Sequence, residues 1–207
     1  MWLYRPCGLE EMALVWRSGS RRWPPRLPEQ PIFYPVTNQG YAARISRDWN
    51  SKSGTGLGYV TRFELEEDYA SSFEPKVVGA RQHEELWVPA EELETFNDHI
   101  EGLIEVIELY ANPDAVGSIP TSGELAGKGA REQLVWFQEH LGGDELERVL
   151  LDAREHVWLN WSLWRHIASE DPRSQQVLDV VGASWSGLGM QVELPDVVAR
   201  MVAAREG

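Results

Sequence analysis

The sequence predicts an α+β fold for its first half and a smaller all-α domain for its second half. In residues 1–110, apolar runs with a period of two alternate with runs of helical period, which is typical of mixed α and β structure. Beyond residue 130 only the helical period is found. Hydrophobic residues make up 43% of the 207 positions and include ten Trp, so the chain has enough apolar side chains for a packed core.

The first 50 residues predict a strand, a helix, a loop and a second helix. WLYRP (2–6) favours a short strand, and LEEMALVWRSG favours a helix that stops at Gly19. RRWPPRLPEQP contains four prolines, which exclude both a helix and a central strand, and the IFYPV that follows is brief and β-prone. Asn38 predicts the N-cap of the helix QGYAARISRDW, in which Tyr41, Ile45 and Trp49 fall on one face.

Strands dominate the rest of the first half. The sequence NSKSGTGLG predicts a loop, and GYVTRFEL alternates as a half-buried strand does. PKVVG, ELWV and GLIEVIEL predict three more strands. Pro89 stands at the position that proline favours at the start of a helix, here AEELETFNDHI.

The second half is predicted to be helical. Residues 111–129 are rich in Gly, Ser, Pro and Thr and predict a loose linker. Four helical segments then fill residues 130–207: AREQLVWFQEHLGG, DELERVLLDAREHVWLNWSLWRHIASEDP, SQQVLDVVGA and PDVVARMVAAR.

Charge is distributed unevenly along the chain. The net charge of −14 and the pI near 4.8 argue against duplex DNA and anionic membranes as partners, since both require clustered Lys and Arg. Residues 1–62 nonetheless hold nine Lys and Arg against four acids, a net +5. The first third is therefore the region best suited to an anionic ligand, although solvated surface charge explains most of these arginines equally well.

The chain carries no sign of secretion or of a membrane anchor. A single cysteine, Cys7, excludes an intramolecular disulfide and a Cys-rich zinc site. We recognise no signal peptide and no apolar run long enough to span a membrane, and expect a cytoplasmic protein. The histidines lack the spacing of metal ligands, so no metal site is predicted. SGTGLG lacks the Lys-Ser/Thr of a phosphate-binding loop and is read as a plain loop.

The pair Glu84 and Glu85 opens an otherwise apolar strand. Neighbours in a strand face opposite sides, so one of the two carboxylates must share a face with apolar residues. A carboxylate in such a place is usually paired or positioned for chemistry. The alternative is a strand end that reaches solvent.

Three segments, in their order along the chain, resemble the signatures of the ADP-ribosyltransferase superfamily. They are LYRPCGLEEMALVWRSG, LPEQPIFYPVTNQGYA and QHEELWVPAEEL, and the resemblance covers residues 3 to about 108. It is strongest to bacterial toxins that modify DNA bases and to short bacterial proteins labelled ADP-ribosylation/J-crystallin. Glu85 lies four residues before Pro89, as the superfamily's catalytic glutamate does. If Glu84 is the catalytic acid instead, Gln82 falls two positions before it, but Pro89 moves out of register.

The resemblance implies a split β-sheet domain that binds NAD as a substrate. Glu85 would orient the ribose and stabilise the positive charge that develops as nicotinamide leaves. Arg5 would bind the adenosine ribose or a phosphate, and Phe33 or Tyr34 would stack on nicotinamide. The remaining candidates are three arginines for the diphosphate and a histidine that positions the acceptor: Arg21, Arg22, Arg26 and His83.

The expected function is transfer of ADP-ribose from NAD to an unidentified protein or small-molecule acceptor, with hydrolysis of NAD as a variant. The alternative is a non-catalytic binding or regulatory module of the same fold. In that case the helical tail would bind a partner through its tryptophans or cap the site (Trp136, Trp158, Trp161, Trp164).

Overall fold

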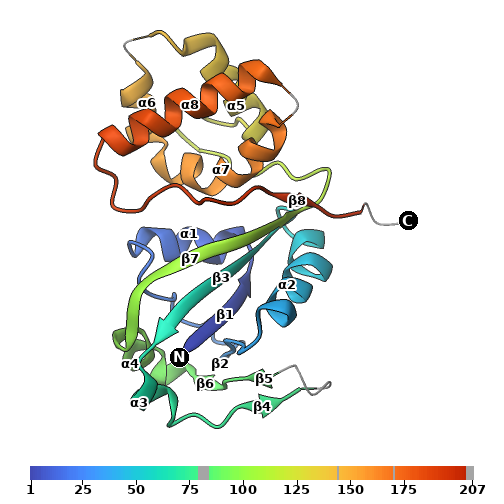
Figure 1. Ribbon diagram of the computed structural model, residues 1–207, viewed down its shortest axis with the longest axis vertical. Coiled ribbons are helices and arrows are strands. Elements are labelled where there is room, and N and C mark those ends of the chain that lie inside the picture. Colours follow the sequence, from blue (N-terminus) through green and yellow to red (C-terminus); the bar gives the residue numbers. More distant parts are fainter. Residues whose placement is uncertain (79–83, 144, 170, 204–207) are drawn as a thin grey trace.

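The computed structural model describes residues 1–78, 84–143, 145–169 and 171–203, and its architecture is α+β (Figure 1). The main sheet has the strand order β1-β3-β7-β8, in which β1, β3 and β7 are antiparallel and β8 runs parallel to β7. Two small antiparallel ladders, β2 with β6 and β4 with β5, lie beside it. The strands are β1 (Trp2–Cys7), β2 (Ile32–Phe33), β3 (Leu57–Leu65), β4 (Lys76–Val77), β5 (Glu84–Glu85), β6 (Val88–Pro89), β7 (Ile100–Ala111) and β8 (Arg200–Met201).

A single residue, Val36, joins the edge of the main sheet to the β4–β5 ladder. It forms antiparallel bridges to Tyr4 of β1 and to Glu85 of β5. The N–H groups of Tyr4 and Val36 each donate to the other's carbonyl oxygen at 2.8 Å, and Leu86 N–H donates to Pro35 O at 2.9 Å. The predicted strand ELWV is thereby split into β5 and β6, and β5 lies one strand away from β1.

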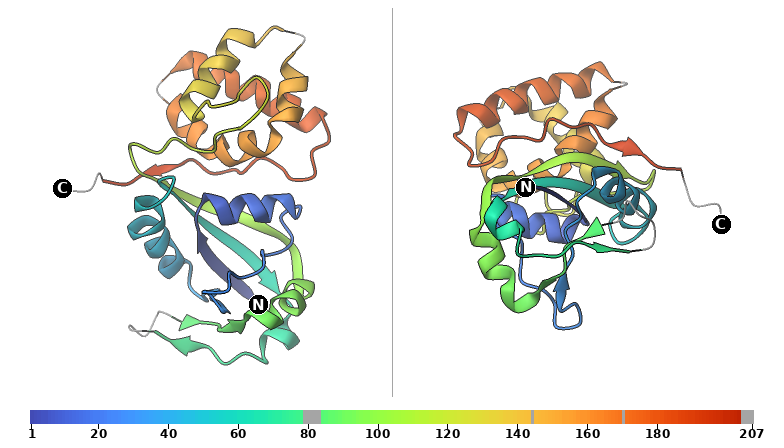
Figure 2. Two further views of the ribbon diagram at one scale, coloured as in Figure 1. Left: turned by 180° about the vertical axis from the view of Figure 1, so that it is seen from behind. Right: turned by 60° about the horizontal axis from the view of Figure 1, so that its bottom comes forward.

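The first half contains helices α1 (Leu9–Arg17), α2 (Gln39–Asp48), α3 (Glu67–Ala70) and α4 (Leu93–Asp98). Helix α1 covers one face of the sheet, as the rear view in Figure 2 shows, and buries Leu9, Met12 and Val15. The helix ends before Gly19, whose φ of +73° is the left-handed conformation that favours glycine at this position. The predicted stop of this helix is therefore confirmed.

Helix α2 begins where predicted but buries a different face. The Asn38 side chain accepts a hydrogen bond from Tyr41 N–H at 3.0 Å, so the predicted N-cap is confirmed. The predicted apolar face is wrong: Ala42 and Ser46 are the buried positions, and Trp49 is 57% exposed. Small residues face inward because the helix backbone lies very close to β3, where a Cβ on Gly58 would come within 2.3 Å of a backbone oxygen of α2.

The second half contains α5 (Ala130–His140), α6 (Leu146–Asp152), α7 (Arg154–Ala168) and α8 (Pro172–Gly187), above the sheet in Figure 1. The four tryptophans considered as a partner surface are buried in its core, so they are not available to a partner (Trp136, Trp158, Trp161, Trp164). One continuous hydrophobic core runs through both halves. The Tyr59 side chain reaches from β3 in the first half to α7 in the second half, where its buried hydroxyl donates a hydrogen bond to Leu159 O at 2.9 Å.

The segment before α5 is packed, in contrast to the loose linker expected from its composition. Ser118 is 5% exposed, and its N–H donates to Asn160 Oδ1 at 2.7 Å. Its carbonyl oxygen accepts from the side-chain amides of Asn160 and Gln133 at 2.9 and 2.8 Å. His156 Nδ1 lies 2.8 Å from Ser118 Oγ. Buried amides thus supply the hydrogen bonds that the irregular backbone lacks.

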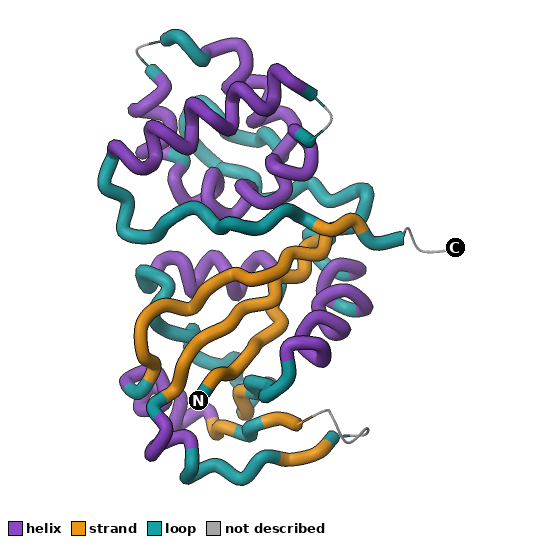
Figure 3. The backbone as a smooth tube through the Cα atoms, in the orientation of Figure 1, coloured by secondary structure: helices purple, strands orange, loops and turns teal. Residues whose placement is uncertain are grey.

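The described chain after α8, to residue 203, is extended, so the helix predicted for PDVVARMVAAR is wrong over residues 195–203. This segment runs back under the helical half and reaches the sheet, as the teal and orange trace in Figure 3 shows. There β8 pairs with the end of β7, and Val202 N–H donates to Ala111 O at 2.8 Å. The free edge of β7 satisfies this backbone, and the β-branched valines of the segment suit an extended conformation.

Candidate active site

Three of the predicted site residues line one pocket. Arg5 from β1, Tyr34 from the segment after β2 and Glu85 from β5 surround a pocket of about 330 Å³. Its remaining lining residues are apolar or proline: Pro6, Val36 and Ile45. Its lining residues belong to β1, the segment after β2, α2 and β5, and Figure 1 labels these elements. No described residue beyond Glu85 lines it, so within those residues the helical tail does not cap the pocket.

The Val36 bridges explain how Glu85 comes to lie close to β1. Glu85 is directly paired with Val36, and Val36 is paired with Tyr4, the neighbour of Arg5. Paired residues share a face and neighbours alternate, so Glu85 lies on the face of Tyr4, whereas the Arg5 side chain points the other way, toward Phe33 and Glu11.

Glu85 and Glu84 face different surroundings, as their alternation in a strand requires. Glu85 Oε1 accepts a hydrogen bond from the Tyr41 hydroxyl at 2.9 Å, and Oε2 accepts from Trp87 Nε1 at 3.2 Å. Glu84 Oε2 accepts from the Thr37 hydroxyl at 3.2 Å and does not line the pocket. Across the described part of the chain, no ion pair between Glu85 and a Lys, Arg or His side chain is found.

Arg5 is 8% exposed and already holds a carboxylate. Its Nε and Nη2 donate to the two oxygens of Glu11 at 2.8 and 3.1 Å, and Nη1 donates to Tyr34 O at 3.2 Å. A guanidinium has five N–H donors, so two remain for other acceptors. Its central carbon lies 4.5 Å from the centre of the Phe33 ring, so the cation stacks on that ring.

Arg26 lies beside Arg5 on the same carboxylate. Its Nη1 is 3.6 Å from Glu11 Oε1, and its Nη2 donates to Gln30 Oε1 at 2.7 Å. Burial, and then the neighbouring Arg5 charge, lower the pKa of the Arg26 guanidinium. Its Nε is buried and has no hydrogen-bond partner among the described residues. The guanidinium groups of Arg5 and Arg26 thus both interact with the Glu11 carboxylate, next to Tyr34.

Of the two aromatic candidates, only Tyr34 faces the pocket. Phe33 is fully buried, with its ring centre 5.4 Å from that of Trp23 and 5.5 Å from that of Phe96. A nicotinamide ring has no access to it, so the stacking role expected for Phe33 conflicts with its burial. Tyr34 is 37% exposed and packs edge-to-face with Trp87 at 5.6 Å.

Arg21 and Arg22 are placed away from this pocket. Arg22 forms ion pairs with Glu94 at 2.6 Å and Asp98 at 2.8 Å, both in α4. Arg21 donates to Gly102 O at 3.3 Å. Neither arginine lines the pocket, so their expected contact with a diphosphate finds no support in their position. His83, the acceptor-positioning candidate, lies outside the described residues.

Sequence reasoning missed Tyr41 and Trp87, the two donors to Glu85. The spacing of Tyr41 and Ile45 is visible in the sequence, but it marks the face of α2 that looks onto the pocket rather than the core. Trp87 is two residues after Glu85, which puts both side chains on one side of an extended backbone.

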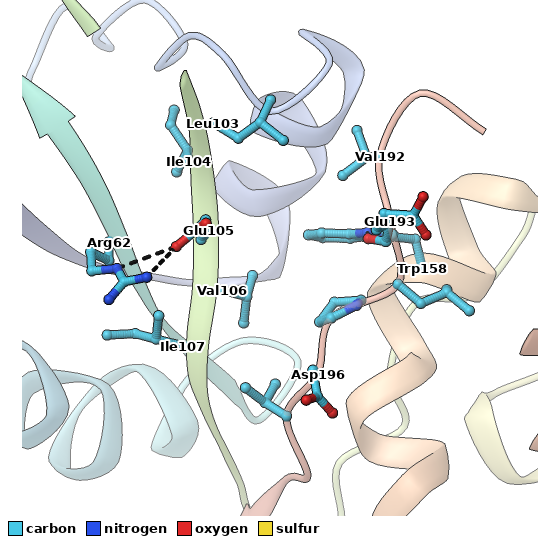
Figure 4. A pocket seen from close by; sticks show the side chains of 13 residues that line it. Arg62, Leu103, Ile104, Glu105, Val106, Ile107, Trp158, Val192, Glu193 and Asp196 are labelled. Atoms are coloured by element: carbon cyan, nitrogen blue, oxygen red, sulfur yellow. Dashed lines mark hydrogen bonds and ion pairs between the residues drawn. The ribbon is translucent and has the colours of Figure 1, made fainter. Parts of the chain in front are cut away.

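A larger pocket of about 530 Å³ lies between β7 and residues 192–197 (Figure 4). Its lining is mainly aliphatic, and three of its four charged side chains are paired. Arg62 holds Glu105 at 2.6 Å, and Asp196 is held by Arg165 at 2.8 Å, while Glu193 is the fourth. None of the residues predicted to bind NAD lines it.

Among the described residues, no cluster of three or more His, Cys, Asp or Glu side chains is placed to hold a metal ion. Within the same residues, no helix is both long and apolar enough to cross a membrane.

Comparisons of the chain with protein-family models, with curated proteins and with solved structures find no match.

Proposed function

We propose that this chain has an ADP-ribosyltransferase-like fold, binds NAD and transfers ADP-ribose to a protein side chain or a small molecule. One observation carries the proposal: Arg5, Tyr34 and Glu85, each selected from a separate sequence segment, line a single pocket. Its volume of about 330 Å³ is at the lower end of the range for small-molecule sites, which suits one end of the dinucleotide. The net charge of −14 disfavours duplex DNA as the acceptor.

The chemistry uses each of the three side chains. Nicotinamide leaves with the electron pair of its bond to ribose C1′, and positive charge develops on the sugar. The Glu85 carboxylate, aimed at the ribose 2′-hydroxyl, stabilises that charge. Tyr34 supplies an exposed ring for nicotinamide, and the two remaining N–H donors of Arg5 are the groups that would bind an anionic or hydroxyl part of the ligand. The acceptor attacks C1′ and releases a proton; if water is the acceptor, the reaction is hydrolysis.

The test compares two neighbouring carboxylates. NAD binding is measured by calorimetry, and nicotinamide release by chromatography, for the wild type, Glu85→Gln and Glu84→Gln. We expect Glu85→Gln to retain NAD binding and to lose about 100-fold or more of the release rate, since it removes the charge that stabilises the transition state. Glu84→Gln is the matched control and should behave as the wild type does. A wild-type protein that neither binds NAD nor releases nicotinamide over hours refutes the proposal.

A second candidate, a binding module of the same fold without catalysis, is favoured by the Glu11 contact. This carboxylate accepts from both Nε and Nη2 of Arg5, at 2.8 and 3.1 Å, which is the bidentate geometry in which arginine binds a phosphate. NAD binding with no nicotinamide release from the wild type identifies this function.

A further inference from the structure

Both oxygens of the Glu85 carboxylate receive a hydrogen bond from a ring side chain. The Tyr41 hydroxyl reaches Oε1 from α2, at 2.9 Å, and the Trp87 indole N–H reaches Oε2 from the segment between β5 and β6, at 3.2 Å. The two donors come from elements about forty positions apart in the sequence. Because each holds a different oxygen, rotation of the carboxylate about its last bond would break both contacts.

Each donor is itself fixed in place. Tyr41 is in the first turn of α2, where its N–H is held by Asn38 Oδ1 at 3.0 Å. Burial, and then the bond to Glu85, raise the pKa of Tyr41 to about 12, so its hydroxyl keeps its proton at neutral pH. The Trp87 ring lies 5.6 Å from Tyr34, and the Lys76 ammonium is 4.3 Å from the Trp87 ring centre.

We propose that Tyr41 and Trp87 are positioning residues that fix the direction of the Glu85 carboxylate toward the pocket. A carboxylate has about four lone-pair sites, so one on each oxygen stays open to a ligand hydroxyl when both donors are bound. Trp87 is a donor only, and a tyrosine that keeps its proton donates to a carboxylate, so neither can be replaced by Phe without losing the bond. The catalytic consequence rests on the function proposed above, whereas the positioning itself does not.

Other charged side chains near Glu85 lie on the elements around it, which are β1, α2, β4 and β5. They are Arg5 on β1, Arg44 on α2, whose charge acts on Tyr41, Lys76 on β4 and Glu84 on β5. All four are present in every variant below, so a change in the environment of Glu85 reports the group that was removed.

The experiment uses the Trp87 indole as a reporter. Its ¹⁵N–¹H resonance is assigned from the signal missing in Trp87→Phe, and its chemical shift at neutral pH is compared in the wild type, Tyr41→Phe and Glu85→Gln. Without the Tyr41 hydroxyl the carboxylate is free to turn and its bond to the indole weakens, so the resonance in Tyr41→Phe should move toward its position in Glu85→Gln, in which the carboxylate is absent.

Tyr4→Phe is the matched control, because Tyr4 packs against the cluster of Val36, Ala42 and Val60 without lining the pocket. Its indole resonance should stay at the wild-type position. The proposal is overturned if Tyr41→Phe leaves the resonance unchanged, if Tyr4→Phe moves it equally, or if Glu85→Gln does not move it.

The activity measurement separates the two proposals. With nicotinamide release as the readout, Tyr41→Phe should lower kcat about tenfold and leave KM for NAD within about twofold, since a positioning group acts on the transition state. Trp87→Phe should lower kcat in the same direction. If the wild type releases no nicotinamide, the proposed function fails, and the indole chemical shift alone decides whether Tyr41 positions Glu85.

Discussion

Replacement of Glu108 by alanine tests how the end of the chain is tied to the helix that borders the pocket. Glu108 is 8% exposed on β7. Its Oε2 accepts from Arg200 Nη1 at 2.5 Å and from the Tyr110 hydroxyl at 2.7 Å, while Oε1 accepts from Gln39 Nε2 at 2.7 Å. One carboxylate thus joins β8, β7 and the first residue of α2.

The size of the effect follows from the exposure of the three donors. Tyr110 is 7% exposed, so its hydroxyl loses a charged partner without gaining water, at a cost of about 2 kcal/mol. The Arg200 side chain is 64% exposed and Gln39 is exposed, so each recovers hydration and contributes about 0.5 kcal/mol. We therefore expect Glu108→Ala to lower the free energy of unfolding by about 3 kcal/mol, and Tm by about 8 °C.

Urea denaturation and differential scanning calorimetry provide the assay, with Glu105→Ala as the control. Glu105 lies on the same strand and holds Arg62 at 2.6 Å, but their side chains are 49% and 41% exposed. Its loss should lower the free energy of unfolding by less than about 1 kcal/mol, since exposed ion pairs contribute little. If Glu108→Ala is no more destabilising than Glu105→Ala, the reasoning from burial is wrong.

Three further predictions concern buried groups. Tyr59→Phe removes the hydroxyl bond to Leu159 and should lower the free energy of unfolding in urea by about 1 kcal/mol, with an unchanged m value because both halves still unfold together. Burial raises the pKa of the Cys7 thiol, so iodoacetamide should label it only after denaturation, as mass spectrometry can show. Burial lowers the pKa of His156, so the unfolded chain takes up a proton below about pH 6.5 before the folded protein does. Stability should therefore fall from pH 7.5 to 5.5, and His156→Gln should weaken that dependence.

The elements of the first half could be predicted because their signals are local. The cap at Asn38 and the stop at Gly19 depend on neighbouring backbone groups, and both are found where expected. The buried face of α2 could not be predicted from hydrophobicity. Gly58 lets the helix approach β3 so closely that Ala42 and Ser46, rather than the larger apolar residues, fit between them.

The errors in the second half arise from contacts with distant residues. PDVVARMVAAR has a helical pattern, yet its backbone pairs with the free edge of β7, more than eighty residues earlier. The Gly- and Ser-rich segment before α5 has the composition of a linker, yet Asn160 and Gln133 fix Ser118 within the helical half. A sheet edge and buried amides supply hydrogen bonds that no local pattern reveals.

The pocket combines predictable and unpredictable features in the same way. The spacing from Glu85 to Pro89 selects one of two glutamates, and strand alternation then directs the other elsewhere. The side chains that hydrogen-bond Arg5 and Glu85 lie on helix faces that a sequence pattern assigns to solvent or to the core. Glu11, on the polar side of α1, fixes the fork of Arg5, and Tyr41, on an apolar side of α2, fixes the carboxylate of Glu85. A ligand that uses this pocket meets a carboxylate whose direction is already set, so less of its binding energy is spent on ordering that group.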